Sequence, residues 1–182
     1  MTRAASPWSV RIGIDQVPDA GRQMAIEADA AIRQALAQQA GLTEISRLTA
    51  TFTLTRPHGE KLRVTGRVNA TVGQVCVVTL EPVTNEIDEP IDLVFLPETR
   101  VAALDRTLDL PVADNDDIPE TTQNGMVDLG AVATEFLLLG IDPYPRKPGV
   151  VFETPAALSD PDEHPFAALA ALKSRNDPER EN

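Results

Sequence analysis

Two neighbouring stretches of this chain alternate strictly between apolar and polar residues, and this alternation restricts the fold more than any other feature. Residues 47–55 ("RLTATFTLT") place apolar side chains on one side and threonines on the other, and residues 61–72 ("KLRVTGRVNATV") repeat the alternation. The connecting residues include Pro57 and Gly59, which favour a turn. Successive side chains of a strand point to opposite faces. The two stretches therefore predict an antiparallel hairpin with one face on the core and the other in solvent.

Hydrophobic periodicity predicts two amphipathic helices. The first covers residues 21–41, where Asp19 is available as a cap and Gly41 ends the pattern. The second covers residues 128–140 and has Asp128 as its N-cap. The shorter elements predicted are strands over 8–14, 74–80 and 90–97, a loop over 81–86 and a helical piece over 166–175.

Together these elements predict an α+β fold, in which a mainly antiparallel β-sheet is flanked by two amphipathic helices and carries an acidic irregular loop. One domain is expected over residues 1–175, with a mobile acidic loop at about 105–125 and a disordered polar tail over 176–182. The first residues lack the apolar stretch of a signal peptide, and the most apolar window, 129–141, is too short to span a bilayer. We expect a cytoplasmic protein without a membrane partner.

The single cysteine, Cys76, lies among valines in "GQVCVVTLEP". A metal site needs several ligands at paired spacings, whereas the two histidines, His58 and His164, are far from Cys76 and from each other in sequence. No base close in sequence would convert the thiol to a nucleophilic thiolate. We therefore expect Cys76 to be a buried strand residue, and we predict no metal, no cofactor and no small-molecule substrate.

Four carboxylates of the acidic loop form a cluster, namely Asp114, Asp116, Asp117 and Glu120. They lack the spacing and the central glycine of a calcium-binding loop, so a solvated loop, or one that binds a partner, is favoured over a metal site. The sequence also contains no phosphate-binding glycine loop and no nucleophile elbow. We therefore predict a non-enzymatic protein and assign no catalytic residue.

Charge is distributed unevenly along the chain. Residues 1–75 carry nine Lys and Arg against six acids, whereas the remaining residues carry seven against twenty-two. On the polar face of the predicted hairpin, Lys61, Arg63 and Arg67 form a row with steps of about 7 Å or multiples of it, and Arg56 lies in the turn. These four cations are the candidate RNA-contact residues. An ordinary solvated strand face is the alternative, and the acidic half of the chain could instead bind a basic protein.

The order of the segments resembles the YceD-like proteins, a family associated with accumulation of large-subunit ribosomal RNA. The resemblance extends over about residues 8–173 and departs from the family pattern at Thr79, where many relatives have a second cysteine. A role for a cysteine pair is therefore not carried over. The stretches that carry the resemblance are "GQVCVVTLEPV" (73–83), "DLGAVATEFLLLGIDPYPRKPG" (128–149) and "HPFAALAALK" (164–173).

The resemblance implies a non-enzymatic ribosome biogenesis factor that supports large-subunit ribosomal RNA accumulation or processing. The expected partner is this RNA or a pre-ribosomal particle. The competing possibility is an acidic interaction module that binds a basic partner, such as a ribosomal protein, without touching RNA. The two possibilities differ in whether the cation row or the carboxylates of the chain meet the partner.

Overall fold

A computed structural model describes residues 6–57, 61–97, 119–122 and 124–152. The chain divides into two compact units, Met1–Pro148 and Gly149–Asn182. Only the first four residues of the second unit are described, so the fold below is that of the first unit.

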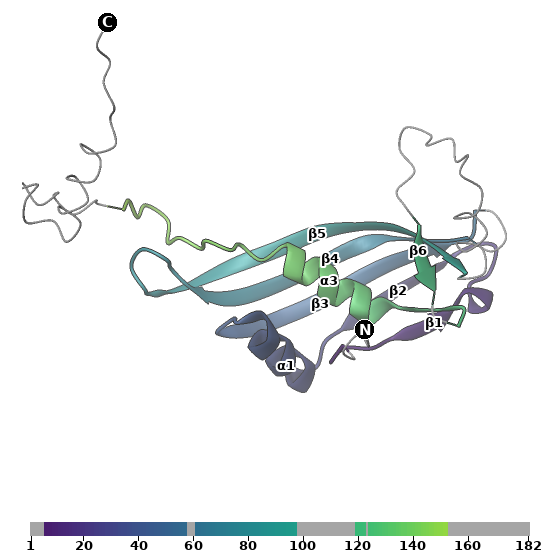
Figure 1. The fold of residues 1–182 in the computed structure, drawn as a ribbon, viewed down its shortest axis with the longest axis horizontal. Helices are drawn as coiled ribbons and strands as arrows, with labels where there is room; N and C mark the ends of the chain where they lie inside the picture. Colours follow the sequence, from purple (N-terminus) through teal and green to yellow (C-terminus); the bar gives the residue numbers. More distant parts are fainter. Residues whose placement is uncertain (1–5, 58–60, 98–118, 123, 153–182) are drawn as a thin grey trace, which may run out of the picture. The chain divides into compact units, whose positions relative to one another are not determined.

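Five strands form the main sheet in the order β2–β3–β4–β5–β6 (Figure 1). Neighbouring strands are antiparallel, except that β5 and β6 are parallel. Two further short strands, β1 and β7, pair antiparallel with each other. The strands are β1 (Arg11–Gly13), β2 (Arg22–Glu27), β3 (Glu44–Thr55), β4 (Leu62–Val75), β5 (Pro82–Pro97), β6 (Glu120–Thr122) and β7 (Met126–Asp128). A 3-10 turn, Ile14–Gln16, follows β1.

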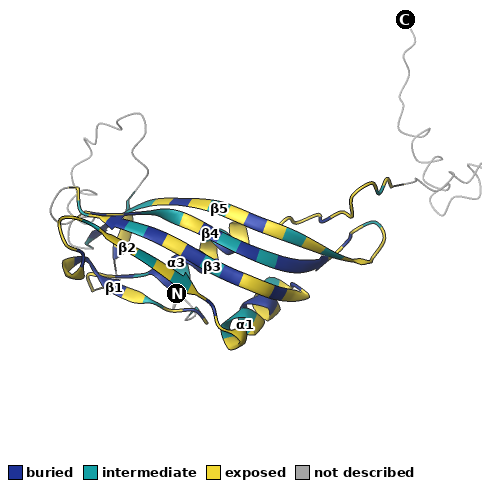
Figure 2. Cartoon of the chain, turned by 180° about the vertical axis from the view of Figure 1, so that it is seen from behind, coloured by how far each residue is buried: buried dark blue, intermediate teal, exposed yellow. Residues whose placement is uncertain are grey.

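The hairpin predicted from the alternating pattern is confirmed as β3 and β4. Phe52 lies opposite Gly66, and Leu54 lies opposite Val64, which places the apolar side chains of both strands on one face. Buried and exposed residues alternate along these strands (Figure 2). The covered face of these two strands contributes ten residues to the core, and fully burying a Val, Leu or Phe side chain contributes about 1.5–3 kcal/mol. The core residues of β3 and β4 are Ile45, Leu48, Ala50, Phe52, Leu54, Leu62, Val64, Val68, Ala70 and Val72.

The helix predicted over 21–41 is wrong in its first third. Residues Arg22–Glu27 form the edge strand β2, in which half-buried Met24 and Ile26 pair with Phe52 and Ala50 of β3. The helix α1 covers only Ala30–Ala40 and packs on β3. Asp29, rather than Asp19, caps it by accepting a 2.8 Å hydrogen bond from Ile32 N–H. Pairing with β3 therefore overrides the helical spacing of the alanines.

The helix α3 (Leu129–Leu139) confirms the second predicted helix and its N-cap, Asp128. It contacts β1, β4 and β5, and its buried residues include Leu129, Val132 and Leu137. The amphipathic character predicted for both helices is not confirmed, because Leu138 and Leu139 at the end of α3 are exposed. Among the described residues, the architecture is α+β with a mostly antiparallel sheet and two α-helices.

Two predictions around the hairpin end are also wrong. The strand predicted over 74–80 and the loop predicted over 81–86 are replaced by one long hairpin, in which β4 runs to Val75 and β5 begins at Pro82. The turn between them is closed by a 2.8 Å hydrogen bond from Cys76 N–H to the Glu81 carbonyl. Of the acidic loop predicted over about 105–125, residues 119–122, 124 and 125 are described, and Glu120–Thr122 form β6; the rest of that loop and the predicted elements beyond 152 lie outside the described residues. The single domain over 1–175 stays a prediction.

Candidate functional site

The open face of the sheet carries the polar residues of β3, β4 and β5 in cross-strand rows. Thr49 of β3 lies opposite Asn69 of β4, which lies opposite Asp88 of β5. The next row toward the turn between β3 and β4 contains Thr51 and Arg67. This is the face for which the sequence predicted a row of cations, and β5 adds carboxylates to it.

Arg63 forms the closest pair on this face. Its Nε and Nη2 atoms donate hydrogen bonds of 2.9 and 2.7 Å to the two carboxylate oxygens of Asp92. This two-point geometry is the strong arrangement for a guanidinium and a carboxylate. The hydrogen bond from Arg63 lowers the pKa of Asp92 below its ordinary value. Both side chains are about half exposed, 51% and 50%, so the pair lies in solvent and contributes little to stability.

Arg67 and Arg47 are also paired with acids of β5, each through one guanidinium nitrogen. Arg67 Nη1 donates a 2.8 Å hydrogen bond to Asp88, which also accepts one from Asn69 at 2.8 Å. Arg47 Nη2 lies 3.4 Å from Glu86. The sequence suggested a basic face separated from the acidic half of the chain. The structure shows that the β4–β5 pairing places acids of the second half directly beside these arginines.

The other two candidate RNA-contact residues lie apart from these pairs. Lys61 is exposed immediately before β4 and forms no ion pair with any residue that the structure describes. Arg56 follows β3, is only partly exposed, and donates a 3.3 Å hydrogen bond to the Val17 carbonyl. It also lines a surface hollow of about 550 Å³ together with Asp15. The four cations therefore do not form one continuous basic surface.

Of the four acidic-loop residues proposed to bind a partner, the structure describes only Glu120. It is exposed in β6 and lies opposite Phe95 of β5. Asp114, Asp116 and Asp117 lie outside the described residues. Glu120 lines a second hollow of about 410 Å³, together with Arg11, Asp128 and Glu135. Within the described ranges, no group of three or more His, Cys, Asp or Glu side chains is arranged to hold a metal ion.

Cys76 is buried, as expected, but it lies in the turn between β4 and β5 rather than in a strand. Its sulfur accepts hydrogen bonds from Thr79 N–H at 3.5 Å and from Lys147 N–H at 3.4 Å. Hydrogen bonding from Thr79, followed by that from Lys147, lowers the pKa of the thiol to about 6. These donors hold the turn against the segment after α3. They do not include a base or a second metal ligand.

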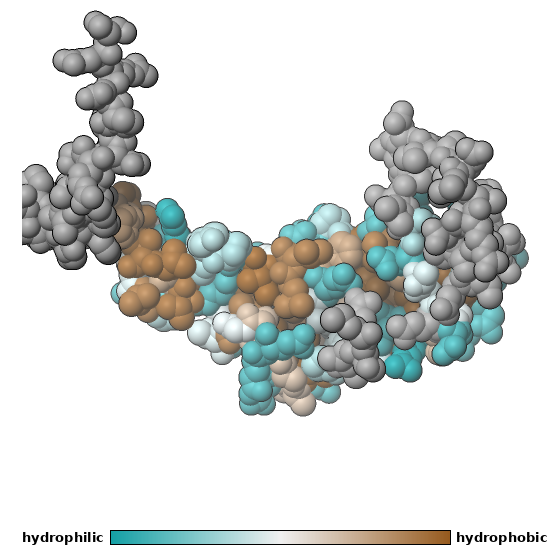
Figure 3. All heavy atoms as spheres, viewed as in Figure 1, coloured by the Kyte–Doolittle hydropathy of each residue, from teal (hydrophilic) through white to brown (hydrophobic). Residues whose placement is uncertain are grey.

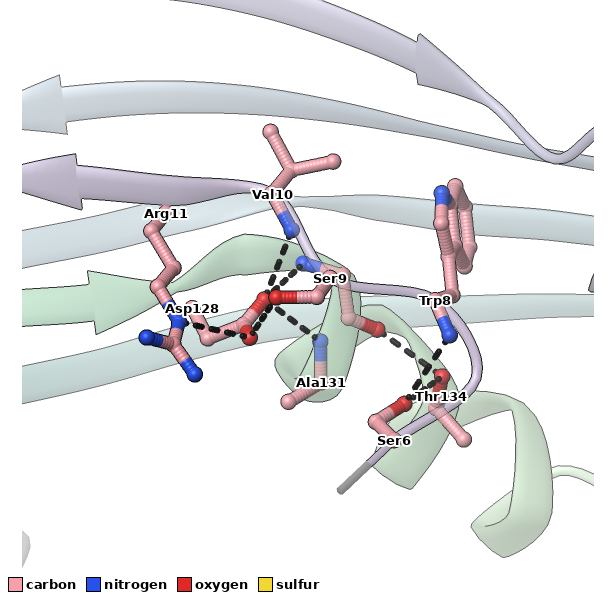
Figure 4. Close-up of polar contacts among 9 residues, drawn as sticks. Ser6, Trp8, Ser9, Val10, Arg11, Asp128, Ala131 and Thr134 are labelled. Carbon is pink, nitrogen blue, oxygen red and sulfur yellow. Dashed lines mark hydrogen bonds and ion pairs between the residues drawn. The ribbon is translucent and has the colours of Figure 1, made fainter.

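A polar centre that the sequence did not predict surrounds Asp128 (Figure 4). Its Oδ1 atom accepts hydrogen bonds from Val10 N–H at 2.8 Å and from Gly130 and Ala131 N–H at 3.1 and 3.2 Å. Its Oδ2 atom accepts one from the Ser9 hydroxyl at 2.5 Å. The sequence signal for a helix cap identified this residue, but nothing in the sequence indicated that the cap also fixes the N-terminal segment.

None of the helices in the described part of the chain has the length and apolarity needed to cross a bilayer.

One known family matches this chain. The family model described as "Large ribosomal RNA subunit accumulation protein YceD" covers residues 64–173, from β4 through α3 and beyond the described residues. No curated protein and no solved structure matches.

Proposed function

The chain belongs to the YceD family, described as large ribosomal RNA subunit accumulation protein, and we propose that it is a non-enzymatic biogenesis factor that binds a precursor of the large ribosomal subunit. The family description supports a role in accumulation of this RNA. We place the action in the cytoplasm, where the protein contacts a protein component of the precursor particle. The sulfur of Cys76, which is buried and bonded to backbone N–H groups, serves the fold rather than a reaction.

The observation that carries the choice of a protein component is the pairing of the arginines on the open sheet face. Binding to nucleic acid depends mainly on cations that neutralise phosphates. Here a phosphate would have to compete with Asp92 for Arg63 and with Asp88 for Arg67. The net charge of −12 adds long-range repulsion. A basic protein partner would not need the paired arginines, and the net negative charge would attract it rather than repel it.

Direct RNA contact remains the second candidate. Arg63 and Arg67 are about half exposed even in their ion pairs, and Lys61 lies immediately before the first residue of the same strand, β4. A phosphate could therefore approach the three cations from the solvent side. This candidate requires that RNA binding depend on Lys61, Arg63 and Arg67.

The proposed function is tested in cells by two measurements on the same cultures. Removal of the protein should lower the ratio of large-subunit to small-subunit ribosomal RNA, and a tagged protein should sediment with large-subunit precursors rather than at its own size. A small-subunit assembly factor with a similar tag serves as the control. An unchanged ratio together with sedimentation as a free protein would contradict the proposal.

A further inference from the structure

Most exposed apolar residues of the first compact unit lie in two areas, the β4–β5 hairpin end with the segment beside it, and the last turn of α3. Seven large apolar side chains are exposed among the described residues of this unit, and all except Met126 lie in the hairpin end, the last turn of α3 or the segment that follows it. Figure 3 shows apolar surface in brown at the hairpin end and over the end of α3. Clusters of this kind usually mark interaction sites, whereas single exposed apolar residues are common. We call these six residues the apolar tip: Val75, Val77, Leu80, Leu138, Leu139 and Tyr144.

Leu80 shows two separate unfavourable features. Its side chain is 77% exposed, although leucine gains free energy from burial. Its backbone adopts φ of +60°, a conformation that Gly and Asn accept far more readily than Leu. A residue chosen for the turn alone would be small or polar. Leu80 is therefore suited to a contact outside the unit.

The apolar tip is held in place by hydrogen bonds between the hairpin end and the segment after α3. Val77 N–H donates to the Pro145 carbonyl at 2.9 Å, and the Gln74 side chain donates to the Asp142 carbonyl at 2.8 Å. Lys147 Nζ lies 2.8 Å from Glu81. A surface fixed before binding loses less conformational entropy on association than a flexible one.

The charges at the hairpin end of the apolar tip balance, whereas the acid Glu89 lies against Gly140 at the end of α3. Lys147 is paired with Glu81, and the same segment adds one further cation, Arg146, and one further acid, Asp142. Such a surface has no excess of cations to displace counterions from RNA. An apolar centre with a polar rim is instead the composition of a protein interface.

We propose that the apolar tip docks into an apolar groove on a protein component of the large-subunit precursor. This inference rests on the proposed function and names the surface that performs it. Leu80 and Tyr144, which are 77% and 71% exposed and lie at or beside the hairpin end, would be the anchors. The paired charges of Glu81 and Lys147 would lie at the rim of the interface.

The test uses the full chain with Leu80→Asn and Tyr144→Gln combined. Asn accepts the positive φ of position 80, so the melting temperature should stay the same or rise. Sedimentation with large-subunit precursors should fall at least tenfold. The matched control is Met126→Gln, which removes an exposed apolar side chain outside the tip and should leave sedimentation unchanged.

A photo-crosslinking amino acid at position 144, compared with one at exposed Thr51 on the sheet face, identifies the partner. Crosslinks from 144 to a large-subunit protein, identified by mass spectrometry in the precursor fraction, are expected. Full sedimentation of the double variant, or crosslinks only to RNA, to lipid or to a second copy, would overturn the inference. Wild-type protein that does not sediment with precursors would instead remove the proposed function, and the inference with it.

Discussion

A single carboxylate, Asp128, joins two distant parts of the chain. It caps α3 through Gly130 and Ala131 and also accepts hydrogen bonds from Ser9 and Val10, more than one hundred positions earlier. A helix cap alone contributes about 1 kcal/mol, and a further hydrogen bond to a charged group adds about 1.5–3 kcal/mol. Asp128 therefore matters more to the fold than an ordinary cap.

Replacing Asp128 with Ala should lower the free energy of unfolding by about 2.5–4 kcal/mol, because both the cap and the tie to the N-terminal segment are lost. Denaturant unfolding measures this. Asp128→Asn keeps an acceptor oxygen for the backbone N–H groups and should lose less than half as much. Equal losses of unfolding free energy in the two variants would show that the hydrogen bonds to Oδ1 do not cause the destabilisation.

The lowered pKa of Cys76 predicts how stability depends on pH. The thiol has a folded pKa of about 6 against an ordinary value of 9.0, so the folded state favours the thiolate. The resulting stabilisation is fully present above pH 9 and is lost as the pH falls toward 6. From pH 6 to 9 the melting temperature of the wild type should therefore rise relative to that of Cys76→Ser. If the melting temperatures of the two proteins changed in parallel with pH, the result would contradict stabilisation of the folded state by the Cys76 thiolate.

At the scale of elements, the β4–β5 hairpin decides the electrostatics of the open sheet face. Each of three arginines on β3 and β4 has a carboxylate of β5 within 3.4 Å. Exposed pairs of this kind contribute about 0–1 kcal/mol each to stability. Their main effect is to occupy the cations that a phosphate would need.

Asp88→Asn and Asp92→Asn together should release Arg67 and Arg63 for other anions. We expect affinity for large-subunit ribosomal RNA to rise and its dependence on salt to become steeper, while the free energy of unfolding changes by less than about 2 kcal/mol. Filter binding at several salt concentrations measures this. Asp19→Asn and Asp29→Asn together, which remove two carboxylates outside the strands, control for net charge. An affinity equal to that of the control would show that the pairs do not mask the arginines.

The hairpin could be predicted because its alternation is encoded locally in residues 47–55 and 61–72. The strand β2 could not, since its spacing of apolar residues also fits a helix and pairing with β3 decided between the two. The length of β5 was missed for a similar reason. Residues 82–90 carry acids and Pro90, which weaken any strand signal, yet β5 pairs with β4 from Pro82 to Phe95.

The candidate site was predicted in part. The polar pattern placed Arg63 and Arg67 on the exposed face, and the structure has them there. The acids beside them were invisible in the sequence, because Asp88 and Asp92 lie twenty or more positions away and meet the arginines only through strand pairing. The hairpin residues of the apolar tip, Val75, Val77 and Leu80, were missed because they resemble an ordinary buried strand.

For the whole molecule, the decisive quantity is the balance of charge on its surfaces. The chain has a net charge of −12, and in the described ranges its exposed cations are either paired, as Arg63 and Arg67 are, or dispersed, as Lys61 is. The family description connects the chain to large-subunit ribosomal RNA. Both facts are satisfied if the protein reaches the RNA particle through one of its proteins.

The most direct test is to measure binding of the purified wild-type protein to large-subunit precursor particles and to the naked ribosomal RNA at the same physiological salt concentration. The account predicts binding to the particles and little or none to the naked RNA. Equal affinity for both, weakened by Lys61→Ala, Arg63→Ala and Arg67→Ala together, would contradict it.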